Sequence, residues 1–323
     1  MPVPADPGTA DAPGVAIEVS GLSMAYGDLL VLDDLDLVIP RGQTVALLGP
    51  NGAGKTTTVE ILEGFRRPSA GTVRVLGQDP ARADEEWRAR VGVVLQSWRD
   101  HPKWQVRELV DVAGAYYAAW STDDTLRPWP TTDLLERVGL SSHATHRIEK
   151  LSGGQRRRLD VAVGLVGRPE LLFLDEPSTG LDPVGRRDLH DLIGDVSDLD
   201  TTILLTTHDL TEAEKLADRV IVLAGGRYIA DGTADELRQA VSEGSQVRWR
   251  DLATGELHAD TTADPTSFLR DLLAARPEGI EVIEVARASL EDAYLELVTR
   301  AEAGQDLRGV TSLREALSVE EQP

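Results

Sequence analysis

The chain has 323 residues, of which 41% are hydrophobic, so it is long enough for about two domains with packed cores. It carries 55 acidic and 33 basic residues, and its formal net charge of −22 disfavours direct binding to nucleic acid, whose phosphates need a basic surface. It contains no cysteine, which excludes disulfide frameworks and thiolate metal sites.

The N-terminal region predicts neither a secretory signal nor a membrane anchor. No Lys or Arg precedes Arg41, and four prolines interrupt the first thirteen residues. No stretch of the chain approaches the roughly 20 consecutive apolar residues of a membrane helix. We therefore expect a cytoplasmic chain that reaches a membrane only through another polypeptide. Residues 1–14, rich in Pro, Ala, Gly and Asp, are predicted to be a disordered tail.

The first half of the chain begins with strand patterns. Short apolar runs predict strands at residues 17–19, 31–39, 44–48, 73–76 and 91–95. The first two fit an antiparallel β region. The run 44–48 is almost continuously apolar, as in a strand buried on both faces, and a helix is predicted at 56–64.

The middle of the chain alternates between helix and strand patterns. Residues 98–165 are predicted to be a mainly helical subdomain, with helices at 106–120 and 132–138. Buried strands follow at 171–174, 203–206 and 220–223, separated by helices at 184–196 and 211–217. This alternation indicates an α/β fold with a mostly parallel core sheet covered on both faces.

The pattern changes beyond about residue 240. Strands are predicted at 246–249, 256–259 and 280–286, and helices at 266–275 and 290–300. We expect residues 241–301 to form a small C-terminal α+β appendage, which regulates or dimerises the protein. Residues 302–323 are predicted to be a loose acidic tail.

A glycine-rich segment after the strand 44–48 matches the phosphate-loop pattern G-x-x-x-x-G-K-[ST]. Its residues are Gly49, Pro50, Asn51, Gly52, Ala53, Gly54, Lys55 and Thr56. Such glycines let backbone N–H groups turn toward one anion, and the following helix adds partial positive charge at its N-terminus. Lys55 can reach the β- and γ-phosphates, Thr56 can offer its hydroxyl to Mg²⁺, and Thr57 can help to orient phosphate oxygens. The motif therefore predicts a nucleoside triphosphate site.

Two adjacent carboxylates end the apolar strand at 171–174. In a phosphate-loop fold the first, Asp175, would contact Mg²⁺, usually through water, and the second, Glu176, could orient or deprotonate the attacking water. Buried strands rarely end in paired acids without a cation or hydrogen bonds that offset their desolvation. The pair supports the nucleotide site.

The segment Leu151-Ser152-Gly153-Gly154-Gln155 resembles the signature sequence of ABC ATPases. The other family motifs follow in the expected order over residues 15–240. Tyr26 is similar to the adenine-stacking aromatic residue, Gln96 to the lid glutamine, residues 178–182 to the loop after the acidic strand, and His208 to the switch histidine. The resemblance implies a P-loop ABC ATPase nucleotide-binding domain at 15–240, with ATP and Mg²⁺ as cofactors.

The resemblance also implies roles for these residues. Thr56, Gln96 and Asp175 would serve Mg²⁺ and its waters. Lys55 would neutralise phosphate charge, Glu176 would act as the general base, and His208 would contact the γ-phosphate and hold the site closed.

The signature residues imply a dimer. Ser152, Gly153, Gly154 and Gln155 open a helix and form a second anion site, far in sequence from the phosphate loop. In the family, two ATPase domains face each other head to tail, and each ATP lies between the phosphate loop of one domain and the signature of the other. One chain carries one set, so we expect a homodimer or a pairing with a homologous ATPase. Residues 156–158, all arginine, are interpreted as lying near phosphate at this helix start.

Two further segments concern what the ATPase drives. Residues 97–104, with Trp98 and Trp104, follow Gln96, where the resemblance implies a groove for a membrane partner. Tryptophan packing within the helical subdomain is the alternative. Residues 288–297 resemble the end of drug- and antibiotic-resistance exporter ATPases, whose permease is a separate chain. The expected function is an ATP-hydrolysing subunit of a type-2 ABC exporter, held at the inner face of the cell membrane through its permease. The alternatives are a soluble ABC ATPase acting on DNA or ribosomes, and a catalytically silent half-site protein.

Overall fold

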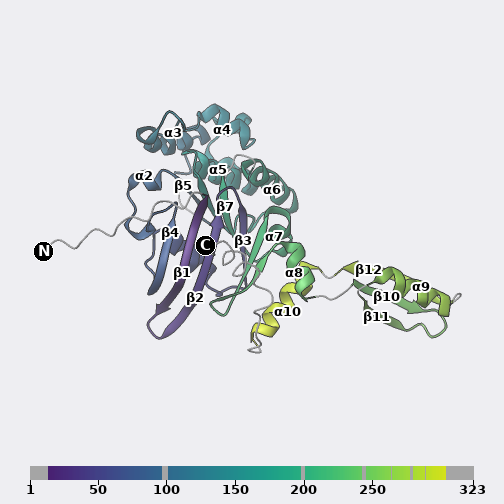
Figure 1. The fold of residues 1–323 in the computed structure, drawn as a ribbon. Helices are drawn as coiled ribbons and strands as arrows, with labels where there is room; N and C mark the ends of the chain where they lie inside the picture. Colours follow the sequence, from purple (N-terminus) through teal and green to yellow (C-terminus); the bar gives the residue numbers. More distant parts are fainter. Residues whose placement is uncertain are drawn as a thin grey trace. The chain divides into compact units, whose positions relative to one another are not determined.

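A computed structural model (Figure 1) describes residues 14–96, 101–197, 201–241, 245–262, 264–276, 279–287 and 289–302. The chain divides into two units. The first comprises residues 1–218 and 225–227, and the second comprises 219–224 and 228–323.

An antiparallel sheet opens the first unit. Its strands are β1 (Val15–Tyr26), β2 (Leu29–Pro40) and β4 (Ala70–Val75), in the order β2-β1-β4. The first two strands are longer than the predicted runs, because polar residues that alternate with buried apolar ones continue both strands. The longer β1 carries Tyr26 to its end, beside the turn at Gly27.

Four parallel strands form the core of the first unit. They are β5 (Val91–Val94), β6 (Leu171–Asp175), β7 (Thr202–Thr207) and β3 (Thr44–Leu48), in the order β5-β6-β7-β3. Every residue of β3 and β7 is buried. Because the strands are parallel, their carboxyl ends share one edge, and this edge brings the phosphate loop, Asp175 and the segment after β7 together.

Helices surround this sheet. They are α1 (Lys55–Leu62), α6 (Pro183–Ser197) and α7 (Leu210–Leu216), with the short segments η1 (Pro80–Arg82) and α2 (Glu85–Arg88). The helical subdomain contains α3 (Val106–Tyr117), η2 (Ala118–Trp120), α4 (Thr131–Arg137), η3 (Ser141–His143), η4 (Ile148–Lys150) and α5 (Gly153–Leu165). In Figure 1, α3 and α4 lie together above α5. A capping box between Gln105 and Glu108 begins α3.

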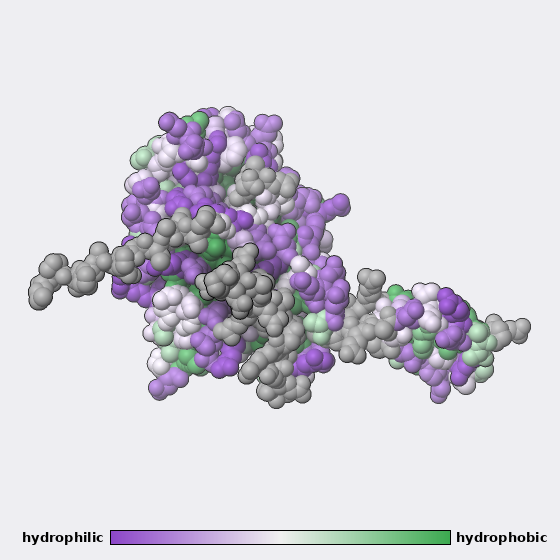
Figure 2. All heavy atoms as spheres, viewed as in Figure 1, coloured by the Kyte–Doolittle hydropathy of each residue, from purple (hydrophilic) through white to green (hydrophobic). Residues whose placement is uncertain are grey.

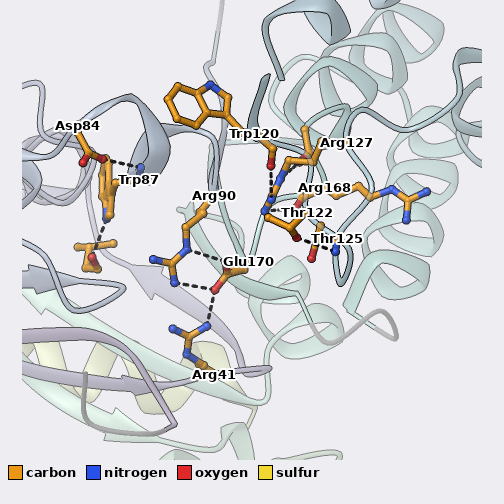
Figure 3. Close-up of polar contacts among 12 residues, drawn as sticks. Arg41, Asp84, Trp87, Arg90, Trp120, Thr122, Thr125, Arg127, Arg168 and Glu170 are labelled. Atoms are coloured by element: carbon orange, nitrogen blue, oxygen red, sulfur yellow. Dashed lines mark hydrogen bonds and ion pairs between the residues drawn. The ribbon is translucent and has the colours of Figure 1, made fainter. Parts of the chain in front are cut away.

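Arginines fix the end of the parallel sheet opposite the phosphate loop. Arg41, before β3, and Arg90, before β5, both donate hydrogen bonds to the carboxylate of Glu170, before β6 (Figure 3). Nearby, Arg127 donates to the carbonyl oxygens of Trp120, in η2, and Gly167, after α5, and so ties these two segments together. These contacts connect segments that are distant in sequence.

The second unit contains β8 (Arg219–Ala224), most of β9 (Arg227–Gly232), α8 (Ala234–Val241) and α10 (Leu290–Glu302). It also contains an antiparallel sheet with the order β11-β10-β12, formed by β10 (Ser245–Asp251), β11 (Leu257–Thr262) and β12 (Ile280–Arg287), and helix α9 (Pro265–Ala275). Trp249 is buried in this sheet and stacks on His258. Helix α10 packs on α8 and β8. The sequence patterns predict the small sheet but not β9 or α8.

The surface agrees with the acidic composition. Figure 2 shows hydrophilic residues over most of the face in view, with apolar residues in scattered spots. Among the helices that the structure describes, none is long and apolar enough to cross a membrane.

Candidate active site

The phosphate loop connects β3 to α1 at the carboxyl edge of the sheet. Gly52 and Gly54 have φ values of 82° and 107°, a left-handed conformation that favours glycine. Gly54 is the N-cap of α1, and the amide of Ala53 donates to the Pro50 carbonyl oxygen at 3.2 Å. The loop therefore curls back on itself and opens directly into a helix N-terminus, as an anion site requires.

Lys55, the first residue of α1, is buried within this loop. Its Nζ donates to the carbonyl oxygens of Gly49, at 2.8 Å, and Pro50, at 3.2 Å, and lies 3.9 Å from Glu176 Oε1. Burial lowers the pKa of Lys55, while the charges of Glu176 and Asp175 act in the opposite direction. Loop carbonyls thus hold the ammonium at the place where the sequence predicts phosphate oxygens.

The two acids at the end of β6 are anchored by the neighbouring strand β7. The hydroxyl of Thr206 donates to Asp175 Oδ1 at 2.6 Å, and the amide of Glu176 donates to Thr206 Oγ1 at 3.0 Å. Glu176 has a φ of 43°, which is uncommon for a residue with a side chain. Such strained backbone concentrates at functional sites, and here the neighbouring strand holds it in place.

The carboxylate of Glu176 is the meeting point of several segments. Gln96 Nε2 donates to Glu176 Oε2 at 3.2 Å, and Thr179 Oγ1 donates to the same oxygen at 3.1 Å. His208 Nδ1 lies 3.3 Å from Glu176 Oε1. Residues that follow β5, β6 and β7 therefore converge with Lys55 on one carboxylate.

Comparisons with known proteins agree with this geometry. The family model described as ABC transporter matches residues 32–179. The daunorubicin resistance ATP-binding protein DrrA3 of Streptomyces coeruleorubidus is 38% identical over 305 residues, which cover 87% of this chain and 95% of that protein. The chain belongs to the family of ABC transporter ATP-binding proteins. It is an ABC ATPase and binds ATP.

Other relatives support the same assignment. The Nod factor export ATP-binding protein I of Paraburkholderia xenovorans (strain LB400) is 42% identical over 225 residues, which cover 70% of this ABC ATPase and 73% of the relative. A solved structure of the ATP-binding subunit of an ABC transporter matches with a TM-score of 0.59 and 28% identity, and covers 69% of this chain and 92% of that one. The expected P-loop ABC ATPase fold is confirmed.

Three other predicted site residues lie around the phosphate loop or at the end of β1. Thr56 is exposed in the first turn of α1, and Thr57 beside it is partly buried. Tyr26, at the end of β1, is 41% exposed, and the guanidinium of Arg66 lies over its ring at 5.1 Å. The Tyr26 ring therefore has one face covered by a cation, in an arrangement suited to stacking.

The signature segment of this ABC ATPase is folded and capped. Ser152 is the N-cap of α5, where its Oγ accepts from the amide of Gln155 at 3.3 Å and its own amide donates to Gln155 Oε1 at 3.0 Å. Gly154 lies close to Gly185 in α6: a Cβ placed on Gly154 would lie 3.3 Å from the Cα of Gly185. Within the described residues, no hydrogen bond or ion pair joins residues 151–155 to the phosphate loop.

The interpretation of residues 156–158 as phosphate-side arginines is wrong for Arg157. Its guanidinium is buried and donates to the carbonyl oxygens of Pro177, Leu95 and Asp175, at 2.6, 2.6 and 3.1 Å. Burial also lowers its pKa. The helical spacing shows this in retrospect, because Arg157 shares the buried face of α5 with Val161 and Leu165. Arg156 instead pairs with Asp160 along the helix.

Sequence reasoning also missed Thr179 and Thr206, which hold the two acids. A signal for Thr206 existed, since it is a polar residue within the fully buried strand β7. A buried hydroxyl needs a partner, and in a parallel sheet the end of a neighbouring strand supplies one. Nothing local in the sequence identifies β6 as that neighbour.

Proposed function

We propose that this ABC ATPase is the ATP-hydrolysing subunit of an exporter and powers transport through a separate membrane permease chain. The observation that carries the proposal is the convergence of Lys55, Gln96 and His208 on the carboxylate of Glu176. The direction of transport rests on names: one relative is named for daunorubicin resistance and another for Nod factor export. These names favour export over a soluble ATPase that acts on DNA or ribosomes.

ATP binding uses the phosphate loop. Its backbone N–H groups and the N-terminus of α1 bind the phosphates, and Lys55 exchanges the carbonyl oxygens of Gly49 and Pro50 for β- and γ-phosphate oxygens. The exposed ring of Tyr26 stacks on adenine. The intact Lys55 and Glu176 argue against a catalytically silent protein.

The residues present fit a magnesium ion. A threonine hydroxyl, an amide oxygen and a carboxylate are the hard oxygen donors that Mg²⁺ prefers. Thr56, Gln96 and Asp175 would supply them, because Thr56 is exposed and Gln96 uses its Nε2 for Glu176, which leaves its carbonyl oxygen for a cation. When bound, Mg²⁺ neutralises phosphate charge.

Glu176 is the proposed general base. Gln96 and Thr179 donate to its Oε2, so the carboxylate is held in one orientation, with Oε1 facing His208 and Lys55. In this arrangement Glu176 accepts a proton from the attacking water. His208, beside it, contacts the γ-phosphate and holds the closed site together. Loss of a general base typically lowers the rate by about 10²–10⁴.

In the part of the chain that the structure describes, no hydrogen bond or ion pair joins residues 151–155 to the phosphate loop of the same chain, and this supports a dimer as the active form. Ser152 and the amides at the start of α5 form an anion site without a Lys-bearing loop. A second chain, identical or homologous, would place this segment over the ATP of the first. ATP would close the dimer, and hydrolysis would open it again.

The proposed permease site lies on the helical subdomain. An open pocket there is lined by Trp104, Glu108 and Val112, and Trp104 stacks on His101 outside the core. Trp104 is half-buried and lines this pocket, which favours a partner groove over core packing. Trp98 lies outside the described residues. The ATPase would thus sit at the cytoplasmic face of the membrane, and residues 241–301 would stabilise or regulate its dimer.

The Glu176→Gln variant tests the catalytic assignment. We expect it to bind ATP, to lose about 10²–10⁴ in turnover, and to accumulate as an ATP-bound dimer in light scattering. The matched control is Glu136→Gln on the exposed surface of α4, which should turn over ATP normally. Near-normal hydrolysis by Glu176→Gln would contradict the assignment.

Transport is tested separately with the permease. The protein, co-purified with its membrane partner and placed in vesicles, should transport a substrate only with ATP, and daunorubicin is the first candidate because of the relatives' names. Co-purification with ribosomes or DNA instead of a membrane protein would favour the alternative function.

A further inference from the structure

Three polar pairs join α6 to α7 in what we call the α6–α7 clamp. The pairs are Arg186 Nη1–Asp209 Oδ2 at 2.7 Å, His190 Nε2–Glu212 Oε1 at 3.3 Å and Lys215 Nζ–Asp191 Oδ1 at 3.0 Å. Helix α6 follows the loop after Glu176, and α7 begins at Leu210, after His208 and the N-cap residue Asp209. The clamp therefore fixes the segment that carries His208 to the segment that follows the general base.

The three pairs differ in burial. His190 and Glu212 are 5% and 1% exposed, so they form the buried base of the clamp. Lys215 and Asp191 are largely exposed, and a surface pair of this kind contributes little. The Arg186–Asp209 pair is half-buried and lies nearest His208 in sequence.

Asp209 holds the backbone around His208. Its Oδ1 caps α7 by accepting from the amides of Thr211 and Glu212, and its own amide donates to Thr207 Oγ1 at 2.9 Å. Its Oδ2 is bound by Arg186. The His208 ring is 54% exposed and lies against Glu176. With little packing around the ring, its position depends on the anchored backbone at Thr207 and Asp209.

We propose that Arg186 is a positioning residue for ATP hydrolysis, and that it holds His208 against Glu176 through its ion pair with Asp209. This inference rests on the role proposed above for His208. Loss of the ion pair frees the start of α7 to shift, and a shift of the His208 ring lowers the rate of the chemical step. The KM for ATP changes little, because the phosphate loop and Lys55, which make most of the ATP contacts proposed above, stay in place.

The test compares variants in two backgrounds. Arg186→Leu and Asp209→Ser both remove the ion pair, and serine preserves a capping hydroxyl for α7. Arg187→Leu is the matched control, since Arg187 is exposed on the same helix. We expect Arg186→Leu and Asp209→Ser to lower kcat about tenfold with the KM for ATP changed less than about twofold, since a misplaced group affects the transition state and not substrate binding. Arg186→Lys should recover most of the rate, and the control should match the wild type.

The His208→Ala background decides between positioning and general stability. If Arg186 acts through His208, Arg186→Leu causes no further fall in kcat once His208 is absent. An equal fall in both backgrounds, or an unchanged kcat in the wild-type background, overturns the inference. Glu176→Gln, measured in parallel, reports on the proposed catalytic site. If kcat falls in Glu176→Gln but not in Arg186→Leu, the inference about Arg186 is overturned and the proposed site stands. Unchanged turnover in both His208→Ala and Glu176→Gln overturns the proposed site as well.

Discussion

The guanidinium of Arg157 donates to the carbonyl oxygen of Leu95 at 2.6 Å, although 62 residues separate them in sequence. Leu95 immediately precedes Gln96, and the same guanidinium also binds the carbonyl of Asp175. One buried side chain therefore joins the helix that follows the signature serine to the two segments that place Gln96 and Glu176. Arg157 connects the helical subdomain to the carboxyl edge of the parallel sheet.

Replacement of Arg157 by leucine should destabilise the fold. The substitution leaves the carbonyl oxygens of Pro177, Leu95 and Asp175 without their donor, and we expect a loss of about 2–4 kcal/mol in the free energy of unfolding. Chemical denaturation measures this directly. Arg156→Ala is the control, because its i,i+4 pair with Asp160 is worth less than about 0.5 kcal/mol. Similar losses in both variants would contradict the prediction.

The local parts of the site could be predicted from the sequence, and the long-range parts could not. The phosphate loop and the acidic pair each lie within one strand and its following turn, so pattern and spacing suffice. The contacts of Arg157 and Arg186 join distant segments, and only the fold sets these distances. Helix α8 was missed although Thr233 and Glu236 form a capping box before it, whereas β9 carries few apolar residues and gives a weak pattern.

Glu63, at the C-terminal end of α1, should make stability fall as pH rises. Burial raises its pKa to about 8, and the charges of Asp175 and Glu60 add to this. Since the folded-state pKa lies above the unfolded value near 4.5, the folded state binds the extra proton, and stability decreases between about pH 4.5 and 8. Glu63→Gln stays neutral, so we expect it to be about 2 kcal/mol more stable than the wild type at pH 8. Urea unfolding at about pH 4.5 and about pH 8 measures the change.

The outcome at low pH separates this effect from better packing. At pH 4.5 the wild-type carboxyl is protonated, so the advantage of Glu63→Gln should vanish. The control is Glu60→Gln, which removes the nearby acid but leaves Glu63 to titrate. A gain of equal size at both pH values would show that titration of Glu63 is not the cause.

Glu170 should make the stability of the fold decrease as pH falls, which is opposite to the effect of Glu63. Burial alone would raise its pKa, but hydrogen bonds from Arg90 and Arg41 outweigh burial and lower the pKa to about 2 (Figure 3). A lowered folded-state pKa gives stability that is present above the unfolded value and is lost as pH falls from about 4.5 to about 2. Glu170→Gln should cost about 1–2 kcal/mol at pH 7, because Glu170 is about one-third exposed and solvent screens the pair.

Thermal melts between about pH 2.5 and pH 7 check the Glu170 prediction, because this range runs from full ionisation into the window where the stability is lost. The difference between Glu170→Gln and the wild type should shrink toward the acid end. Glu149→Gln serves as a control, since its partner Arg147 is 61% exposed and the pair lies at 3.7 Å. A difference for Glu170→Gln that stays constant with pH would contradict the assigned ion pairs.

The boundary predicted near residue 240 suggests a deletion experiment on the second unit. Helix α10 lies beyond the small sheet in sequence, yet it packs on α8 and β8, where Leu290, Ala293 and Leu297 are buried. Truncation after Val241 removes this apolar face, and we expect it to cost about 3–6 kcal/mol. Replacement of only residues 245–287 by a flexible linker of about ten Gly and Ser residues keeps α10 and should leave stability within about 1 kcal/mol of the wild type. Urea denaturation gives the free energy of unfolding of both variants. If both lose the same amount, the small sheet itself stabilises the ATPase core.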